Sequence, residues 1–110
     1  MIKTRIYSPY SIEVAWLLGA QIKLGRKRRK WTESELADRA GISRATLQKI
    51  EKGDMTCAIG LVFEVATLVH VPLFDDDKTS MPIHMDKMSD KLALLPKAIR
   101  KMRKVVDDDF

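Results

Sequence analysis

The chain has 110 residues, 45% of them hydrophobic and 32% charged, which fits one domain with a single modest core and a short appendage. The lone cysteine, Cys57, excludes an intrachain disulfide and a multi-cysteine zinc site, and it favours a reducing, cytoplasmic environment. Twenty Lys and Arg against fifteen Asp and Glu give a net charge of +5, which favours a polyanionic partner.

Residues 1–10 are predicted to form an N-terminal arm, because Pro9 disfavours a helix at the residue before it. Ser11 can cap a helix from about 12 to 29. The apolar residues of this segment recur on one helical face: Ile12, Ala15, Leu18 and Ile22. Six of the eight residues from 23 to 30 are basic, so the helix is predicted to end in a cationic segment.

Two short helices are predicted next. Thr32 should begin the first, because Glu35 stands three residues on in the capping-box arrangement, and Gly41 should end it. Ser43 should cap the second, from about 44 to 52, and Gly53 should stop it.

The segment AIGLVFEVATLVH, opened by Thr56 or Cys57, is apolar on most sides and is predicted to be the central core helix. Pro72 and the aspartates at 75–77 close that unit. Residues 78–82 are predicted to form a linker, and a further helix from about 84 to 95 should end at Pro96. The predicted organisation is therefore an arm, residues 1–10, a helical domain, residues 11–77, and a C-terminal helical extension with an acidic tail, residues 78–110.

Residues 33–53, ESELADRAGISRATLQKIEKG, carry the most specific pattern in the chain. Two helices that cross over a short turn need a small residue at the crossing, which Ala37 supplies, and Gly41 tolerates the left-handed backbone of the turn. The apolar residues that would anchor both helices to a third are Leu36, Ile42, Leu47 and Ile50. This joint spacing predicts an all-α fold with a helix-turn-helix, whose second helix lies in the DNA major groove.

The segment IKLGRKRRKWTESELADRAGISRATLQKIEKGD resembles the Cro/C1-type (Xre) helix-turn-helix domains of phage repressors and bacterial regulators, and the resemblance covers residues 18–74. It implies a lambda-repressor-like bundle of four to five helices that binds inverted-repeat operator DNA as a homodimer and represses transcription. By position it implies three base-reading residues, Arg44, Ala45 and Lys49. It also implies an ion pair between Arg26 and Glu51 beside the DNA backbone. At Glu33 the chain departs from the glutamine that many members carry.

Other residues are candidates for contacts with phosphates or the groove edge: Arg26, Arg28, Thr32, Ser43, Thr46 and Gln48. Thr32 and Ser43 stand at predicted helix N-termini, where free N–H groups and the helix dipole favour a phosphate oxygen, although a plain capping role fits Ser43 equally well. Arg44 can donate two parallel hydrogen bonds to guanine O6 and N7, and Lys49 can reach the same edge. Ala45 offers only a methyl group to thymine.

Three segments, SRATLQKIEKGD, CAIGLVFEVATLVHVPLFD and KLALLPKAIRK, also resemble the HipB-like antitoxins of HipBA-type toxin–antitoxin pairs. This narrower resemblance implies autoregulation of an operon and binding of a HipA-like serine/threonine kinase. A stand-alone Xre-family regulator with no toxin partner is one alternative. A protein-interaction module that uses the fold without DNA is another.

Other classes of function have weaker support. Cys57 lies beside a predicted helix N-terminus, which would lower its pKa and permit a redox role, but a buried structural thiol is favoured. The sequence has no phosphate-cradling glycine loop and no metal-ligand cluster, so no catalytic residue, cofactor or metal is predicted. The basic amphipathic segment 16–31 could bind a membrane surface, but its apolar side is needed for packing. No apolar run approaches the roughly 20 residues of a membrane span.

An apolar stripe near the C-terminus, Leu92, Leu95, Ile99 and Met102, continues across Pro96 and is flanked by basic residues. An exposed stripe of this kind normally finds a partner surface. Residues 84–110 are therefore predicted to contribute to dimerisation or to kinase binding, with Phe110 as a minor contact. Packing of the stripe against the protein's own fourth helix is the alternative.

Overall fold

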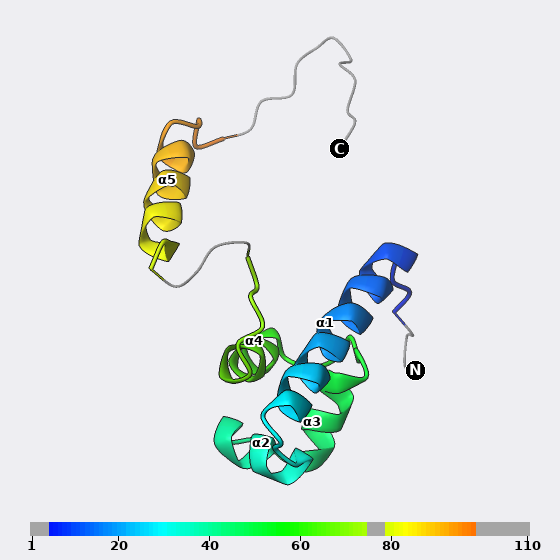
Figure 1. Ribbon diagram of the computed structural model, residues 1–110. Helices are drawn as coiled ribbons and strands as arrows, with labels where there is room; N and C mark the ends of the chain where they lie inside the picture. Colours follow the sequence, from blue (N-terminus) through cyan, green and yellow to red (C-terminus); the bar gives the residue numbers. More distant parts are fainter. Residues whose placement is uncertain (1–4, 75–78, 99–110) are drawn as a thin grey trace. The chain divides into compact units, whose positions relative to one another are not determined.

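The computed structural model describes residues 5–74 and 79–98, and within these ranges it contains helices and no strand. The helices are α1 (Pro9–Arg28), α2 (Glu33–Ala40), α3 (Arg44–Glu51), α4 (Ile59–Leu68) and α5 (Met81–Ala93) (Figure 1). The all-α prediction is confirmed. The chain divides into two compact units, Met1–Asp75, which holds α1 to α4, and Asp76–Phe110, which holds α5. Of the helices described, none has the length and hydropathy of a membrane span.

Helix α1 begins at Pro9, three residues before the predicted start and inside the predicted arm. Ser8 is the N-cap: its backbone is extended, and its hydroxyl accepts a hydrogen bond from the N–H of Ser11. Proline fits the first helical position, because the N–H that it lacks would have no partner within the helix there. The proline that keeps Ser8 out of the helix thus begins the helix itself.

The core of the first unit lies where α1, α2, α3 and α4 meet. Eight apolar residues are buried there: Ile22, Leu36, Ala37, Leu47, Ile50, Val65, Ala66 and Val69. They include three of the predicted anchors of the helix-turn-helix, and the fourth, Ile42, packs against them partly buried. Ile12, which was expected on the inner face of α1, is 50% exposed.

Helix α4 differs from the expectation of a helix buried on most sides. It begins at Ile59, after an Ala58 N-cap that makes no side-chain hydrogen bond, and not at Thr56 or Cys57. Ile59 is 67% exposed and Phe63 is 43% exposed. Only one face of α4 contacts the core, because α2 packs on that face and the other apolar face is left open.

Four helix ends in this unit share one hydrogen-bond pattern. The N–H of a residue just past the helix donates to the carbonyl five residues earlier, in the last turn: Trp31 to Arg26, Ile42 to Ala37, Asp54 to Lys49 and Val71 to Ala66. The pattern needs one residue with positive φ at each helix end. Those residues are Lys30, Gly41, Gly53 and His70, with φ of 60°, 71°, 81° and 59°. The two glycine stops were predicted, whereas the other two helices end without a glycine.

Glycines on α1 let the helices approach closely. A Cβ on Gly19 would lie 2.5 Å from the carbonyl oxygen of Ile50, in the last turn of α3. A Cβ on Gly25 would lie 3.0 Å from Val69, just past α4. Helix α1 therefore packs backbone to backbone against the end of α3, which fixes where α3 sits.

Helix α5 lies in the second unit, of which residues 79–98 are described. It begins at Met81, with Pro82 in its first turn, so the predicted linker of residues 78–82 overlaps the helix. No residue of α5 is buried. Its apolar side chains Met81, Met85, Met88 and Leu92 are spaced four, three and four residues apart and share one face. Ile99, Met102, the acidic tail and Phe110 lie outside the described residues.

Candidate nucleic-acid interface

The turn between α2 and α3 sets the direction of α3. Gly41 has a left-handed backbone, with φ of 71° and ψ of 32°, and the Ile42 N–H donates to the Ala37 carbonyl at 3.0 Å. Ala37 is 2% exposed, as a small residue in tightly packed surroundings should be. A Cβ on Gly41 would meet nothing within 4 Å, so glycine is needed there for its backbone and not for space.

Helix α3 has one buried and one exposed face. Leu47 and Ile50 point into the core, whereas the three predicted base-reading residues, Arg44, Ala45 and Lys49, are exposed. The side chain of Arg44 is 63% exposed. The solvent-exposed side of α3 therefore carries a guanidinium group, a methyl group and an ammonium group.

The N-termini of α2 and α3 are both capped as predicted. At α3, the Ser43 hydroxyl accepts from the Thr46 N–H at 3.0 Å and donates to the Thr46 hydroxyl at 2.9 Å. At α2, Thr32 and Glu35 form a capping box. The hydrogen bond that Glu35 accepts from the Thr32 N–H, and after it the proximity of the Thr32 side chain, lower the pKa of the Glu35 carboxyl. Other N–H groups of each first turn have no partner within their helix, which is the usual geometry of a phosphate site.

Glu33 links α2 to the exposed face of α3. Its Oε1 atom accepts from Nε of Arg44 at 3.0 Å and from Nε2 of Gln48 at 3.1 Å. These two bonds, that from Gln48 foremost, lower the pKa of the Glu33 carboxyl. From the sequence, Glu33 could be identified only as a departure from the glutamine that many family members carry. Its contact with α3 could not be predicted, because nothing in the sequence places the start of α2 beside the first turn of α3.

Arg26 and Glu51 form the ion pair that the family resemblance implies. Nε and Nη2 of Arg26 donate to the two carboxylate oxygens of Glu51 at 2.7 and 3.1 Å, and Nη1 donates to the Trp31 carbonyl at 3.0 Å. Both side chains are almost fully buried. The hydrogen bond with Glu51 raises the pKa of Arg26 against the opposing effect of burial. The pair ties the last turn of α1 to the last residue of α3.

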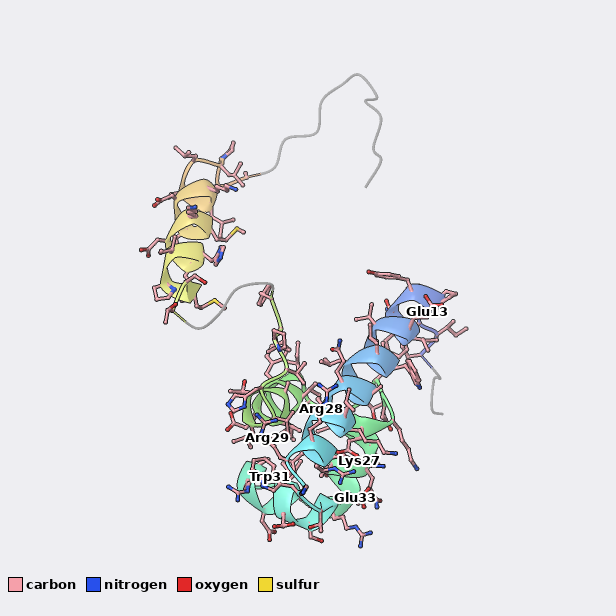
Figure 2. The ribbon with its side chains drawn as sticks, in the orientation of Figure 1. Glu13, Lys27, Arg28, Arg29, Trp31 and Glu33 are labelled. Carbon is pink, nitrogen blue, oxygen red and sulfur yellow. The ribbon has the colours of Figure 1, made fainter. Side chains whose placement is uncertain are left out.

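The cationic end of α1 divides into exposed and engaged side chains. Lys27 and Arg28 are exposed, whereas Arg29 donates to the Val69 carbonyl at 3.0 Å and contacts the His70 ring. Figure 2 labels Lys27 and Arg28 in the last turn of α1 and Arg29 just past it, with Trp31 and Glu33 following. The Arg39 guanidinium lies 4.3 Å from the centroid of the Trp31 ring. That cation–π contact, which the sequence did not predict, fixes Trp31 between α1 and α2.

Cys57 is not the activated thiol that a helix N-terminus would produce. Helix α4 begins two residues later, at Ile59, and the thiol is partly buried against the core. Burial foremost, and then the Asp54 carboxylate, raises the pKa of the Cys57 thiol. The expected lowering is therefore wrong in sign. Among the described residues, no three His, Cys, Asp and Glu side chains gather as a metal ion would require.

Comparison with known proteins gives matches over part of the chain. The HTH-type transcriptional regulator SutR of Escherichia coli (strain K12) is 32% identical over 59 residues, which make up 54% of this chain and 33% of that protein. This chain thus spans about a third of its relative's length. A solved HipB complex with an O2 20mer is 26% identical, and a solved MDT protein is 28% identical. Both have a TM-score of 0.49, and the similarity covers 70% and 69% of this chain and 99% of each solved chain.

The profile of the helix-turn-helix family matches residues 22–74. This range runs from the inner face of α1, through the α2–α3 turn, to the residues that follow α4. It contains the left-handed Gly41, the capped α3 and the buried Arg26–Glu51 pair. The resemblance to helix-turn-helix domains that the sequence indicates is therefore confirmed over residues 22–74.

Proposed function

We propose that this protein is a sequence-specific DNA-binding regulator of transcription that inserts α3 into the major groove of an operator. The observation that carries the proposal is the exposed face of α3, where Arg44, Ala45 and Lys49 stand on a rigidly packed helix. An α-helix fits the major groove, in which each base pair presents a distinct pattern of donors and acceptors. The curated relative, named as a transcriptional regulator, supports the same function.

In this proposal Arg44 and Lys49 read guanine, and Ala45 contacts a thymine methyl group. Phosphates are bound by the capped N-termini of α2 and α3, together with exposed cations and hydroxyls: Arg28, Thr32, Ser43 and Thr46. Gln48 lies at the groove edge, where its amide keeps one N–H that Glu33 does not take. Arg26 is buried against Glu51, so we assign it the task of holding α1 and α3 in register. Its own contact with a phosphate stays a prediction.

A homodimer on an inverted repeat follows from the size of α3. One helix of eight residues reads only a few base pairs, so useful specificity requires a second copy on the adjacent half-site. The apolar face of α5 is the surface that we assign to this association, since no residue of α5 is buried. Repression of the protein's own promoter is the simplest regulatory role for such a dimer.

We further propose a HipA-like serine/threonine kinase as a protein partner, on the basis of the HipB-like segments in the sequence. Calorimetry with a kinase-like protein encoded beside this gene tests it. Nanomolar or micromolar binding supports an antitoxin, and no binding leaves a stand-alone regulator.

The DNA proposal is tested by fluorescence anisotropy with a duplex selected from a randomised pool and with its scrambled counterpart. We expect affinity to fall steeply between 50 and 200 mM salt, because each neutralised phosphate releases counterions. Arg44→Ala should cost roughly 1–3 kcal/mol on the selected duplex and little on the scrambled one. Arg28→Ala is the matched control and should weaken both equally. Equal losses for Arg44→Ala on both duplexes would remove it as a base reader, and absence of any preferred duplex would favour a protein-interaction module.

A further inference from the structure

One carboxylate oxygen at the start of α2 accepts hydrogen bonds from two side chains of α3. Oε1 of Glu33 accepts from Nε of Arg44 at 3.0 Å and from Nε2 of Gln48 at 3.1 Å. Arg44 and Gln48 are four residues apart and therefore lie on the same side of α3. The Glu33 side chain is 27% exposed and the Arg44 side chain is 63% exposed, so the contact lies at the edge of the face that would meet DNA.

The atom that Glu33 binds on Arg44 decides which donors remain. Nε is taken, whereas neither terminal nitrogen of Arg44 has a hydrogen-bond partner in the part of the chain that the structure describes. A guanidinium bound through Nε retains Nη1 and Nη2 as a parallel pair of donors. That pair matches O6 and N7 on the major-groove edge of guanine.

We infer that Glu33 is a positioning residue for base recognition: it fixes the Arg44 guanidinium so that the two terminal nitrogens face one guanine in each half-site. The inference rests on the proposed DNA-binding function. A free arginine side chain loses rotamer entropy on binding, and a side chain already held in place loses less. Glu33 thus acts on DNA through Arg44 and makes no contact with the base itself.

Because Glu33 is negatively charged, it should affect sequence specificity and overall DNA affinity in opposite directions. A carboxylate near the phosphates opposes binding to every duplex, whatever its sequence. Here that charge lies against Arg44, and the pocket around it is lined by Arg26, Thr32, Ser34 and Arg44. Removal of the carboxylate should therefore strengthen nonspecific binding while weakening the preference for guanine. A residue that only stabilised the fold would reduce both.

The test compares full-length variants on two duplexes, the selected one and a copy in which 7-deazaguanine replaces the guanine assigned to Arg44. Glu33→Ala should lower the ratio of the two affinities roughly three- to tenfold, a fraction of what a bidentate contact supplies. Glu33→Gln should keep most of the ratio, because the amide oxygen still accepts from Nε of Arg44. Asp38→Ala, the matched control, removes an exposed carboxylate of α2 that has no bond to Arg44, and it should leave the ratio unchanged.

A double-mutant cycle completes the test. If Glu33 acts through Arg44, the double variant Glu33→Ala with Arg44→Ala should show the same ratio as Arg44→Ala alone. Additive losses, or a Glu33→Ala variant with the wild-type ratio, overturn the inference. If the proposed DNA-binding function itself is wrong, the result differs, because the wild-type protein would then select no preferred duplex from the pool. Circular dichroism of each variant checks that the fold is intact.

Discussion

Gly19 shows how a single missing Cβ positions α3. Its Cβ would lie 2.5 Å from the Ile50 carbonyl oxygen and 2.8 Å from that of Glu51, so α1 and α3 would have to move apart. We expect Gly19→Ala to lower the free energy of unfolding by roughly 1–3 kcal/mol, the usual cost of overpacking. Urea denaturation measures the change.

Gly60 is the matched control for Gly19, because a Cβ there meets nothing within 4 Å. Gly60→Ala should therefore stabilise the protein by about 0.5 kcal/mol, since alanine restricts the unfolded chain more than glycine does. Equal effects of the two substitutions would contradict the close contact between α1 and α3.

Gly41 is required for a different physical reason. Its surroundings are open, but its φ of 71° is strained for a β-branched residue. Gly41→Val should cost on the order of 1–3 kcal/mol, whereas Gly41→Asn should cost less, because asparagine tolerates the left-handed region. Thermal unfolding of both variants tests this, and a Gly41→Val protein with the parent melting temperature would show that the turn has another conformation in solution.

At the scale of the element, the cap of α2 makes stability depend on pH. Glu35 has a lowered pKa chiefly because the Thr32 N–H donates to its carboxylate in the folded protein. A carboxyl whose folded pKa lies below the unfolded value, about 4.3, contributes stability above that value and loses it as pH falls through the folded pKa. Stability should therefore decrease from about pH 5 downward.

Urea denaturation at several pH values between 7 and 3 tests this dependence on the wild type and Glu35→Gln. The variant should have the flatter profile, although the lowered pKa values of Glu33 and Asp54 keep part of the slope. A profile that is identical in the two proteins would mean that the capping box contributes nothing in solution.

The elements differ in how far the sequence could predict them. The caps of α2 and α3 depend on residues three positions apart, so they could be predicted from the sequence. They are the Thr32–Glu35 capping box of α2 and the Ser43 N-cap of α3. The positive φ at Lys30 and His70 was not, because those residue types give no local signal and the hydrogen-bond pattern of each helix end selects the conformation. The α4 segment is a continuous apolar run, and such a run does not show which side of the helix faces the core. The exposure of Ile59 could therefore not be predicted.

The candidate site divides in the same way. The family resemblance placed Arg26 beside Glu51, and spacing alone put Arg44, Ala45 and Lys49 on one helix. The bond between Glu33 and Arg44 depends on the angle at which α2 and α3 cross, which is set by packing around Ala37 and Gly41. A contact between side chains on two different helices depends on how the helices pack. Such a contact leaves no periodic pattern in the sequence.

At the scale of the whole molecule, the two units differ in what they bury. Among the residues that the structure describes, all eight buried core residues, from Ile22 to Val69, belong to the first unit. The second unit offers α5, 13 residues long and with none of them buried. An isolated helix of that length is marginal in water, so we expect α5 to gain stability when a partner surface covers its apolar face.

We therefore expect a chain truncated after Phe74 to fold cooperatively, because it keeps the complete core, but to lose self-association. Sedimentation of the full-length and truncated proteins measures this. Two point variants separate the apolar face from the rest of α5: Leu92→Asp changes the face shared by Met85 and Met88, whereas Ile83→Asp changes the opposite side at similar exposure. Leu92→Asp should dissociate the dimer at concentrations where Ile83→Asp does not. A truncated protein that still dimerises would move the interface to the first unit, where the open face of α4 around Ile59 and Phe63 is one exposed apolar surface to test and the N-terminal half of α1 around Trp16 is another.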